Sequence, residues 1–445
     1  MVGFSLFIIW FFLAIISYIK NRDILSPAKY YLFNIGLYFA AIFYKPYSVS
    51  IYFVYLLFLI IGFILIIFEP INNDIKYNKV DKRNFSYLNK FNMRRAFRII
   101  WFLSIIPIGA QLYLIYYMGG LQGYINKLGL RVVEWQGMGI VLEMINLFSI
   151  LNIFYFSLMI CYSKPKKFDW LKYLLHFIVL LTIGFLSGSR GGLLSNIVLM
   201  VIVYNYLRSK ISIKAIATIA IVLILVASVL GIARNGYKLT DEGFSSGITN
   251  NDELFSLEHF EYGITPLELI YSSSSPLYEL QYGFTFLTPV TNLIPRKIWP
   301  NKPDTGGLVF TKIYTGNAWG GYSNLAPGII GEGVINFGRT FGTLAGIAIF
   351  MAVMFWVYLL YKRITSKLSS EKINLKTIAL LVFYSFVITT VPGLVQSEWT
   401  NTMLSVFLKG IKLLFIYIII LKFPNFTLYK KSKIGYNAAP SGGKS

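Results

Sequence analysis

Residues 49–68 read VSIYFVYLLFLIIGFILIIF, a run of twenty positions without a charged side chain. A helix of that length reaches about 30 Å, which matches the hydrocarbon thickness of a bilayer. Similar apolar runs occur at Phe4–Ile19, Ala215–Ala233 and Ile411–Leu421. The whole chain is 56% hydrophobic and 13% charged, which leaves too little polar surface for a water-soluble domain. The sequence therefore predicts an all-α, polytopic integral membrane protein.

The apolar runs predict eleven transmembrane helices, and we expect the chain 1–445 to form a single transmembrane domain. The predicted spans lie at about 3–19, 29–45, 48–69, 97–118, 140–161, 173–188, 192–207, 215–233, 340–361, 377–395 and 402–421. One long segment, 234–339, is inserted between the eighth and ninth spans. The closing stretch, 437–445, is polar and rich in Gly and Ser, and it predicts a flexible tail.

The distribution of basic residues predicts the orientation of these spans. Of the 41 Lys and Arg residues, 28 lie on one side, chiefly in short loops, and only four lie in short loops of the opposite side. Cytoplasmic loops carry such an excess, so the long segment 234–339 is predicted to be extracytoplasmic. The net charge of +22 therefore reflects topology, and it does not indicate binding of nucleic acid.

A glycine-rich turn joins two predicted spans on the outer side. It reads Ser187-Gly188-Ser189-Arg190-Gly191-Gly192. Glycines let a ligand approach backbone N–H groups, and the start of the next helix favours an anion such as phosphate. Arg190 can add a bidentate contact to phosphate oxygens. The alternative is an ordinary hairpin whose arginine reaches the lipid headgroups.

A proline-framed cationic stretch lies within the long segment. It contains Arg296, Lys297 and Lys302 among three prolines, with Trp299 beside them. Rigid backbone and clustered cations are typical of a clamp for an anionic group, and the tryptophan offers a stacking surface for a sugar. The alternative is that these cations meet anionic headgroups, with the tryptophan at the membrane interface.

The remaining outer loop, 119–139, offers Arg131 and Glu134 near an aromatic residue as a further site. The alternative is an amphipathic helix with an ion pair at i and i+3.

Two residues of the long segment are candidates for a general base. Glu332 lies between two glycines just before a span, and His259 is surrounded by acids that would raise its pKa. No His/Cys cluster or nucleotide-binding loop is present, so we expect no metal site.

Two lysines, Lys409 and Lys412, lie inside the last predicted span. A charge at that depth is costly unless it faces a partner or a water-filled cavity. They are either additional cations for a pyrophosphate or, in the case of Lys412, part of the packing of the bundle.

Together, the order and sidedness of these motifs resemble those of the Wzy-type oligosaccharide repeat-unit polymerases of bacterial surface polysaccharide synthesis. The resemblance rests on the turn at Gly188–Gly191, the Arg131 loop and the run from Pro295 to Pro303. It continues in Pro327-Gly328, Gly331-Glu332 and Asn336-Phe337-Gly338, which precede a span.

The resemblance implies a GT-C-like helical bundle with one large extracytoplasmic loop, in a multi-pass protein of the bacterial inner (plasma) membrane. It implies that undecaprenyl-pyrophosphate-linked repeat units are joined into O-antigen or capsular polysaccharide, with release of undecaprenyl pyrophosphate and without a cofactor. The implied pyrophosphate-binding residues are Arg190, Arg296 and Arg131, joined by Lys302 and Arg234 and by the glycines Gly188, Gly191 and Gly192. A chain-length regulator and a flippase of the same pathway are the implied partners.

Two other functions fit part of the same pattern. A transporter or flippase for lipid-linked glycans needs polar residues deep in several spans, whereas here the deep charges are Lys409 and Lys412. An O-antigen ligase, which transfers finished polymer to a lipid A core, shares the phosphate-binding logic.

Overall fold

The structure is a computed structural model that describes most of the chain. The described residues are 2–70, 93–128, 134–135, 137–163, 165–187, 190–240, 243–246, 264–272, 279–294, 298–314, 326–369 and 373–422. For residues 190, 191, 193, 224, 226–240 and 243–246, the backbone alone is described.

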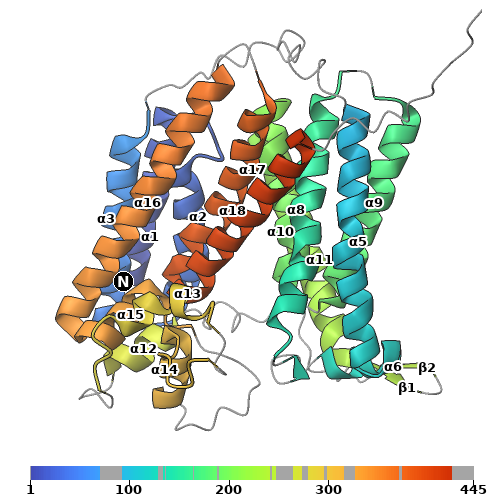
Figure 1. The fold of residues 1–445 in the computed structure, drawn as a ribbon. Helices are drawn as coiled ribbons and strands as arrows, with labels where there is room; N and C mark the ends of the chain where they lie inside the picture. The colour runs from blue at the N-terminus through green and yellow to red at the C-terminus, as the bar shows by residue number, and fades with distance from the viewer. Residues whose placement is uncertain are drawn as a thin grey trace, which may run out of the picture.

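Long helices make up most of the described residues (Figure 1). They are α1 (Val2–Lys20), α2 (Pro27–Tyr38), α3 (Val49–Phe68), α5 (Met93–Tyr117), α8 (Gly139–Cys161), α9 (Lys167–Leu186), α10 (Arg190–Leu207), α11 (Ile213–Gly236), α16 (Arg339–Ser369), α17 (Leu375–Thr390) and α18 (Trp399–Lys422). Short elements connect them: α6 (Gly120–Lys127), α12 (Thr265–Ser272), α13 (Thr288–Thr291), α14 (Gly306–Tyr314), α15 (Gly328–Phe337) and the 3-10 helices η1 (Ala40–Phe43), η5 (Phe284–Leu287) and η6 (Val391–Val395).

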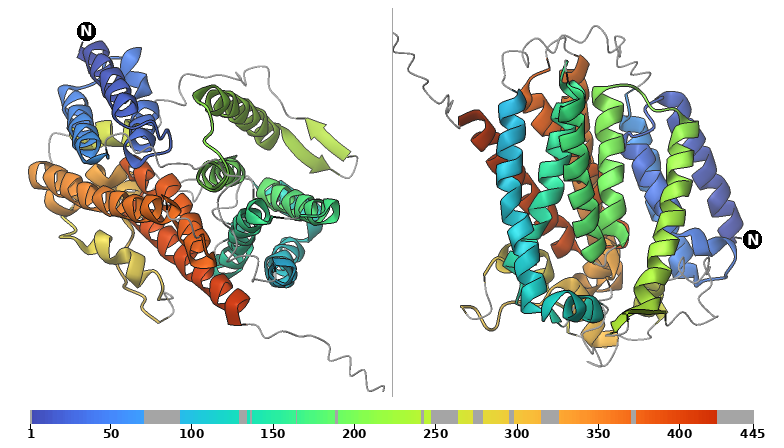
Figure 2. Two further views of the ribbon diagram at one scale, coloured as in Figure 1. Left: turned by 90° about the horizontal axis from the view of Figure 1, so that it is seen from above. Right: turned by 90° about the vertical axis from the view of Figure 1, so that its right-hand side faces the viewer.

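The long helices form two groups with a shared centre. Helices α1, α2, α3 and α16 lie on one side, and α5 with α8 to α11 lie on the other (Figures 1 and 2). Helix α17 lies between the groups and contacts α8, α10, α16 and α18. Its buried face is almost wholly aliphatic and aromatic, so it forms the apolar centre that joins the two groups.

The predicted membrane architecture is confirmed. Eight helices in the described part of the chain are long and apolar enough to cross a bilayer, and further apolar stretches lie at Leu194–Leu207 and Ile213–Leu223. Each of the eleven predicted spans falls on a helix. The span predicted at 29–45 is divided into α2 and η1. Helix α16 extends well past the predicted end at 361, and its 31 residues reach roughly 46 Å.

A small antiparallel hairpin was not predicted. Strands β1 (Tyr237–Thr240) and β2 (Gly243–Ser246) follow α11 directly, with Tyr237 opposite Ser246. These residues fall in the long segment 234–339, for which the sequence predicts no strand, because four-residue strands are too short to show a clear hydrophobic alternation.

Buried polar side chains connect the helices inside the bundle. The Asp23 carboxylate, 2% exposed, accepts hydrogen bonds from the hydroxyls of Tyr206 on α10 and Tyr361 on α16, both at 2.8 Å. This loop carboxylate, which follows α1, therefore links α10 of one group to α16 of the other.

A second polar cluster lies among α5, α8 and α9. His176 Nδ1 lies 2.8 Å from the Asn152 amide nitrogen, and His176 Nε2 lies 2.9 Å from the Ser104 hydroxyl. Because that hydroxyl donates to the Ile100 carbonyl at 2.8 Å, it accepts from the Nε2–H of a neutral imidazole. The histidine thus holds three helices together, as a packed interhelical histidine does.

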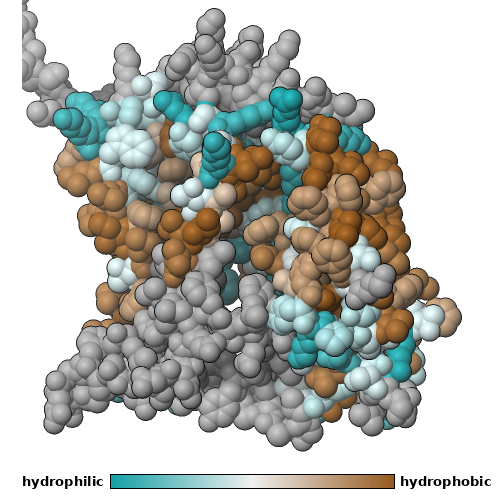
Figure 3. Space-filling view, turned by 180° about the vertical axis from the view of Figure 1, so that it is seen from behind, coloured by the Kyte–Doolittle hydropathy of each residue, from teal (hydrophilic) through white to brown (hydrophobic). Residues whose placement is uncertain are grey.

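The molecular surface has the pattern expected for a membrane protein. Apolar side chains cover its middle, and hydrophilic side chains gather along one end, with a smaller group towards the other (Figure 3). At the other end lie α6, the hairpin and α12 to α15 (Figure 1). We call this the loop end; it contains the described parts of the long segment and the turn between α9 and α10.

Candidate functional site

Helix α15 is fixed at the loop end by glycines. Gly328, with φ +67°, starts the helix so close to η6 that an added Cβ would lie 2.2 Å from the Val395 carbonyl oxygen. A Cβ on Gly333 would lie 2.2 Å from the carbonyl oxygen of Gly342 on α16. Real Cβ contacts never come so close, so only glycine permits this backbone packing. The ten-residue helix is too short to span a bilayer, and it is held against the ends of two spans.

Glu332 lies at the centre of this arrangement. Its side chain has no exposed surface, and its Oε2 accepts a 3.0 Å hydrogen bond from the backbone N–H of Trp399 at the start of α18. Its Oε1 is buried without a hydrogen-bond partner. A Cβ on Gly306 would lie 2.4 Å from the Glu332 carboxyl carbon, so glycine is required at the facing position too.

Burial raises the pKa of the Glu332 carboxyl to about 8, although the Trp399 N–H and the Thr285 hydroxyl oppose that shift, and the nearby Glu398 adds to it. At neutral pH the group is therefore mostly protonated. A carboxyl that holds a proton near working pH, with one oxygen free, is suited to proton transfer.

A second buried carboxyl, Glu398, lies just before α18 and is 2% exposed. Its Oε1 accepts from the backbone N–H of Gly307 at 3.2 Å, and its Oε2 accepts from the Asn401 amide at 2.7 Å. Burial raises the pKa of the Glu398 carboxyl. Glu332 therefore caps the N-terminus of α18, and Glu398 caps that of α14. Each carboxyl faces the positive end of a helix dipole.

Asn336 on α15 binds the segment around η5 through its side-chain amide. Its amide oxygen accepts from the Gly283 N–H at 2.8 Å, and its amide nitrogen donates to the Thr285 hydroxyl at 2.6 Å and to the Glu332 carbonyl at 2.8 Å. The Trp399 indole N–H donates to the Phe286 carbonyl at 3.0 Å. The segment around η5 is thus held firmly beside both acids.

The proline-framed cationic stretch is described in part. Arg296 and Lys297 lie outside the described residues. The Lys302 ammonium donates to the Ile294 carbonyl at 2.9 Å. Trp299 is 40% exposed at the loop end, where a stacking surface was predicted. Lys302 therefore has a structural contact within the long segment.

The glycine-rich turn lies between α9 and α10, as predicted. Gly188 is outside the described residues, and α10 begins at Arg190, whose side chain is not described. Gly191 and Gly192 lie in the first turn of α10, and the Gly192 carbonyl accepts from Asn196 at 2.8 Å. The Tyr124 hydroxyl of α6 donates to the Leu186 carbonyl at 2.7 Å, so α6 packs on the turn.

The structure shows little of three other residues that the sequence predicts for the site. Arg131 and His259 lie outside the described residues, and Arg234 lies in the last turn of α11, where the backbone alone is described. Glu134 pairs with Lys127 at 3.4 Å, both partly exposed. The structure therefore brings Glu332 and Lys302 to the same end as the Arg190 turn.

The deep lysines of α18 have separate surroundings. The Lys412 ammonium donates to the Glu143 carbonyl at 2.8 Å and pairs with the Glu143 carboxylate on α8. The Lys409 ammonium lies 5.4 Å from the centre of the Phe386 ring. Of the two roles considered for Lys412, its contacts with Glu143 support the one in packing of the bundle. Among the described residues, no three His, Cys, Asp or Glu side chains form a group that could hold a metal ion.

Sequence reasoning did not single out Glu398. A signal existed, because an acid directly before a span is a favourable N-terminal residue for a helix. Its contact with Gly307 joins positions 91 residues apart, and no local pattern reveals it.

Comparison with known proteins supplies the family. The model of the family described as O-antigen polysaccharide polymerase Wzy matches residues 1–302, a stretch that includes the Arg190 turn and Arg296 and ends before Glu332. No curated protein and no solved structure gives a match. The chain belongs to the O-antigen polysaccharide polymerase Wzy family, a family of multi-pass membrane polymerases that join lipid-linked oligosaccharide repeat units into O-antigen.

Proposed function

We propose that this protein polymerises undecaprenyl-pyrophosphate-linked repeat units at the outer face of the bacterial inner membrane. The match of residues 1–302 to the polymerase family carries this proposal. The charge asymmetry of the loops supports an extracytoplasmic position for the loop end, since 28 Lys and Arg residues lie on the opposite side.

The reaction is a glycosyl transfer between two lipid-linked glycans. A hydroxyl oxygen at the non-reducing end of the new repeat unit attacks the anomeric carbon of the growing chain. The bond from that carbon to the pyrophosphate oxygen breaks, and undecaprenyl pyrophosphate leaves with the bonding electrons. The hydroxyl proton passes to a base. The donor brings its own leaving group, so no nucleotide is consumed.

Cations at the loop end stabilise the charge that develops on the departing pyrophosphate. We assign this role to Arg190, Arg296 and Arg131, with Lys302 and Arg234 beside them. The start of α10 at Arg190 supports the assignment, because free N–H groups at a helix N-terminus favour phosphate oxygens.

We assign the role of base to Glu332. Its Oε2 is fixed by the Trp399 N–H, and its Oε1 has no partner and can take a proton. The side chain is fully buried and the Gly306 backbone packs against its carboxyl, so the acceptor hydroxyl can reach Glu332 only when α14 moves away from it.

Complementation of a deletion strain tests the function. Loss of a polymerase leaves a single repeat unit on the final acceptor, whereas loss of a ligase leaves long polymer on the lipid carrier and loss of a flippase leaves repeat units facing the cytoplasm. We expect single repeat units in the deletion strain, seen by gel analysis of surface glycan, and a polymer ladder when the gene is restored. Stranded polymer or cytoplasmic repeat units would contradict the proposal.

A further inference from the structure

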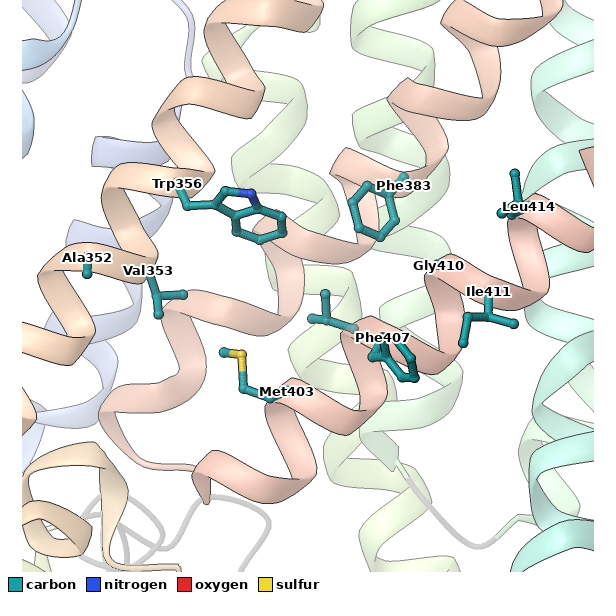
Figure 4. Close-up of a pocket in the computed structure, with 10 residues that line it drawn as sticks. Ala352, Val353, Trp356, Phe383, Met403, Phe407, Gly410, Ile411 and Leu414 are labelled. Carbon is teal, nitrogen blue, oxygen red and sulfur yellow. The ribbon is translucent and has the colours of Figure 1, made fainter. Parts of the chain in front are cut away.

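An open apolar groove runs between α16, α17 and α18, further along α18 into the bundle than Glu332 and Glu398. Its volume is about 610 Å³, within the range of roughly 300–1,000 Å³ that is usual for small-molecule sites. Figure 4 shows Trp356 of α16 and Phe383 of α17 on one side, and Met403 and Phe407 of α18 on the other.

The groove exists because of a glycine and several uncovered large side chains. A Cβ on Gly410 would lie 3.0 Å from the Phe383 ring, so glycine keeps the floor of the groove open there. Trp356 is 42% exposed and Phe407 is 54% exposed, although both belong to membrane-spanning helices. The protein leaves these faces uncovered, so in a bilayer they contact lipid chains.

One helix, α18, links the groove to the candidate site. Helix α18 begins at Trp399, whose N–H is bound to Glu332, and Met403 follows about one turn later. From Met403 to Leu414 the groove follows the helix for roughly 16 Å. A molecule with its headgroup at the loop end can therefore lay its tail along α18.

We propose that this groove binds the polyprenyl chain of the lipid-linked glycan. The inference rests on the proposed function, and it adds the place where the lipid is recognised. A single, methyl-branched isoprenoid chain suits one narrow groove lined by aromatic rings, whereas a phospholipid brings two acyl chains and a glycerol backbone. The groove holds the tail, so that the pyrophosphate stays at the loop end.

Photo-crosslinking in lipid nanodiscs tests the proposal. The probe is undecaprenyl phosphate with a diazirine in its isoprenoid chain, and the nanodiscs contain phosphatidylethanolamine and phosphatidylglycerol. We expect labelled peptides to fall between Met403 and Leu414. Unlabelled undecaprenyl phosphate should remove the label, and added phosphatidylglycerol should not. Label spread evenly over α1, α3 and α5, or removed equally by both lipids, would overturn the proposal.

Variants that fill the groove provide a second test. Gly410→Leu and Ile411→Trp each add apolar bulk in the groove, and we expect each to weaken probe binding roughly tenfold or more. Gly109→Leu is the matched control, because a Cβ at Gly109 of α5 meets nothing within 4 Å. It should bind the probe as the wild type does.

The readout is binding, so it separates this proposal from the proposed function. A protein that polymerises glycan but shows no specific label on α18 refutes the groove alone. Specific label on α18 without polymerisation refutes the function and leaves a lipid site. Unchanged binding in folded Gly410→Leu and Ile411→Trp proteins also refutes the groove.

Discussion

At the scale of single residues, Glu332 and Glu398 are both buried, but their carboxyl oxygens differ in how many hydrogen bonds they accept. Both oxygens of Glu398 accept hydrogen bonds, from Gly307 and Asn401. One oxygen of Glu332 accepts from Trp399, and the other has no partner. The acid with the free oxygen is the one suited to receive a proton, and the fully bonded acid is suited to hold α14 against α18.

Glu332→Gln separates a base from a structural acid. The amide oxygen of glutamine can still accept from the Trp399 N–H, but glutamine cannot take a proton. We expect polymerisation in membranes to fall by about 10²-fold or more, in the usual range for loss of a general base, while the protein remains folded. Polymer chain length and initial rate give the readout. A Gln variant that works like the wild type would leave Glu332 a positioning role only.

The pH dependence of the rate follows from the same carboxyl. Glu332 must be ionised to accept a proton, and its pKa is raised to about 8. We therefore expect the rate to increase with pH and to level off above about 8. The measurement is the initial rate of chain extension in buffered proteoliposomes. A rate that stays constant from pH 6 to 9 would contradict the assignment.

The free energy of unfolding should decrease as the pH rises, whereas the reaction rate should increase. A carboxyl whose pKa is higher in the folded state binds more protons when folded, so it stabilises the fold at low pH. That stabilisation should be lost as the pH rises from about 4.5 to about 8. Thermal unfolding in detergent should show this loss in the wild type, and Glu332→Gln should reduce it. An equal pH dependence in both proteins would mean that Glu332 is not protonated in the fold.

At the scale of elements, the glycines of α15 and α16 determine how closely the loop end approaches the spans. Gly333 on α15 faces Gly342 and Gly346 on α16, and the two backbones touch. The proposed base Glu332 is positioned more precisely by such contact, because small residues allow close backbone packing without flexible side chains.

Gly333→Leu should separate α15 from α16. A side chain there would collide with the Gly342 backbone, and overpacking of this kind costs about 1–3 kcal/mol. We expect a lower unfolding temperature in detergent and loss of polymer. Gly109→Leu has open space around it and should change neither. If Gly333→Leu unfolds at the wild-type temperature, the close contact is not a feature of the protein.

The elements were largely predictable from the sequence, and the site was not. A membrane span is specified by the composition of about twenty consecutive residues, so windows such as 49–68 identify it directly. The partners of Glu332 and Glu398 come from segments 67 and 91 residues away, and side-chain pairing over such distances leaves no periodic signal. The acid Glu332 was predicted because its glycine neighbours are unusual; the partners that bury it were not.

At the scale of the whole molecule, Asp23 links the two groups of helices, because it accepts hydrogen bonds from α10 and from α16. Asp23→Ala would remove the acceptor of the buried Tyr361 hydroxyl and would leave Tyr206 with its 3.2 Å bond to the Leu25 carbonyl, and a buried unsatisfied group costs about 1–3 kcal/mol. We expect a clear fall in the unfolding temperature in detergent. Asp304→Ala removes a partly exposed pair with Lys312 and serves as the control. Equal unfolding temperatures for the two variants would contradict this role of Asp23.

The overall architecture accounts for a polymerase that handles a lipid-bound substrate. Lipid chains have access to the groove beside α18, and the acids and the Arg190 turn lie together at one end of the bundle. This arrangement fits a reaction in which the headgroup stays at the membrane surface and the tail remains in the bilayer.

Reconstitution with a defined substrate tests the central claim most directly. The purified protein in proteoliposomes is given one undecaprenyl-pyrophosphate-linked repeat unit, and both glycan length and released undecaprenyl pyrophosphate are measured by mass spectrometry. We predict glycans of increasing length, with one molecule of lipid pyrophosphate released for each linkage formed, and loss of both products in Arg190→Ala and Arg296→Ala. Repeat units that remain single in the presence of folded wild-type protein would contradict the account.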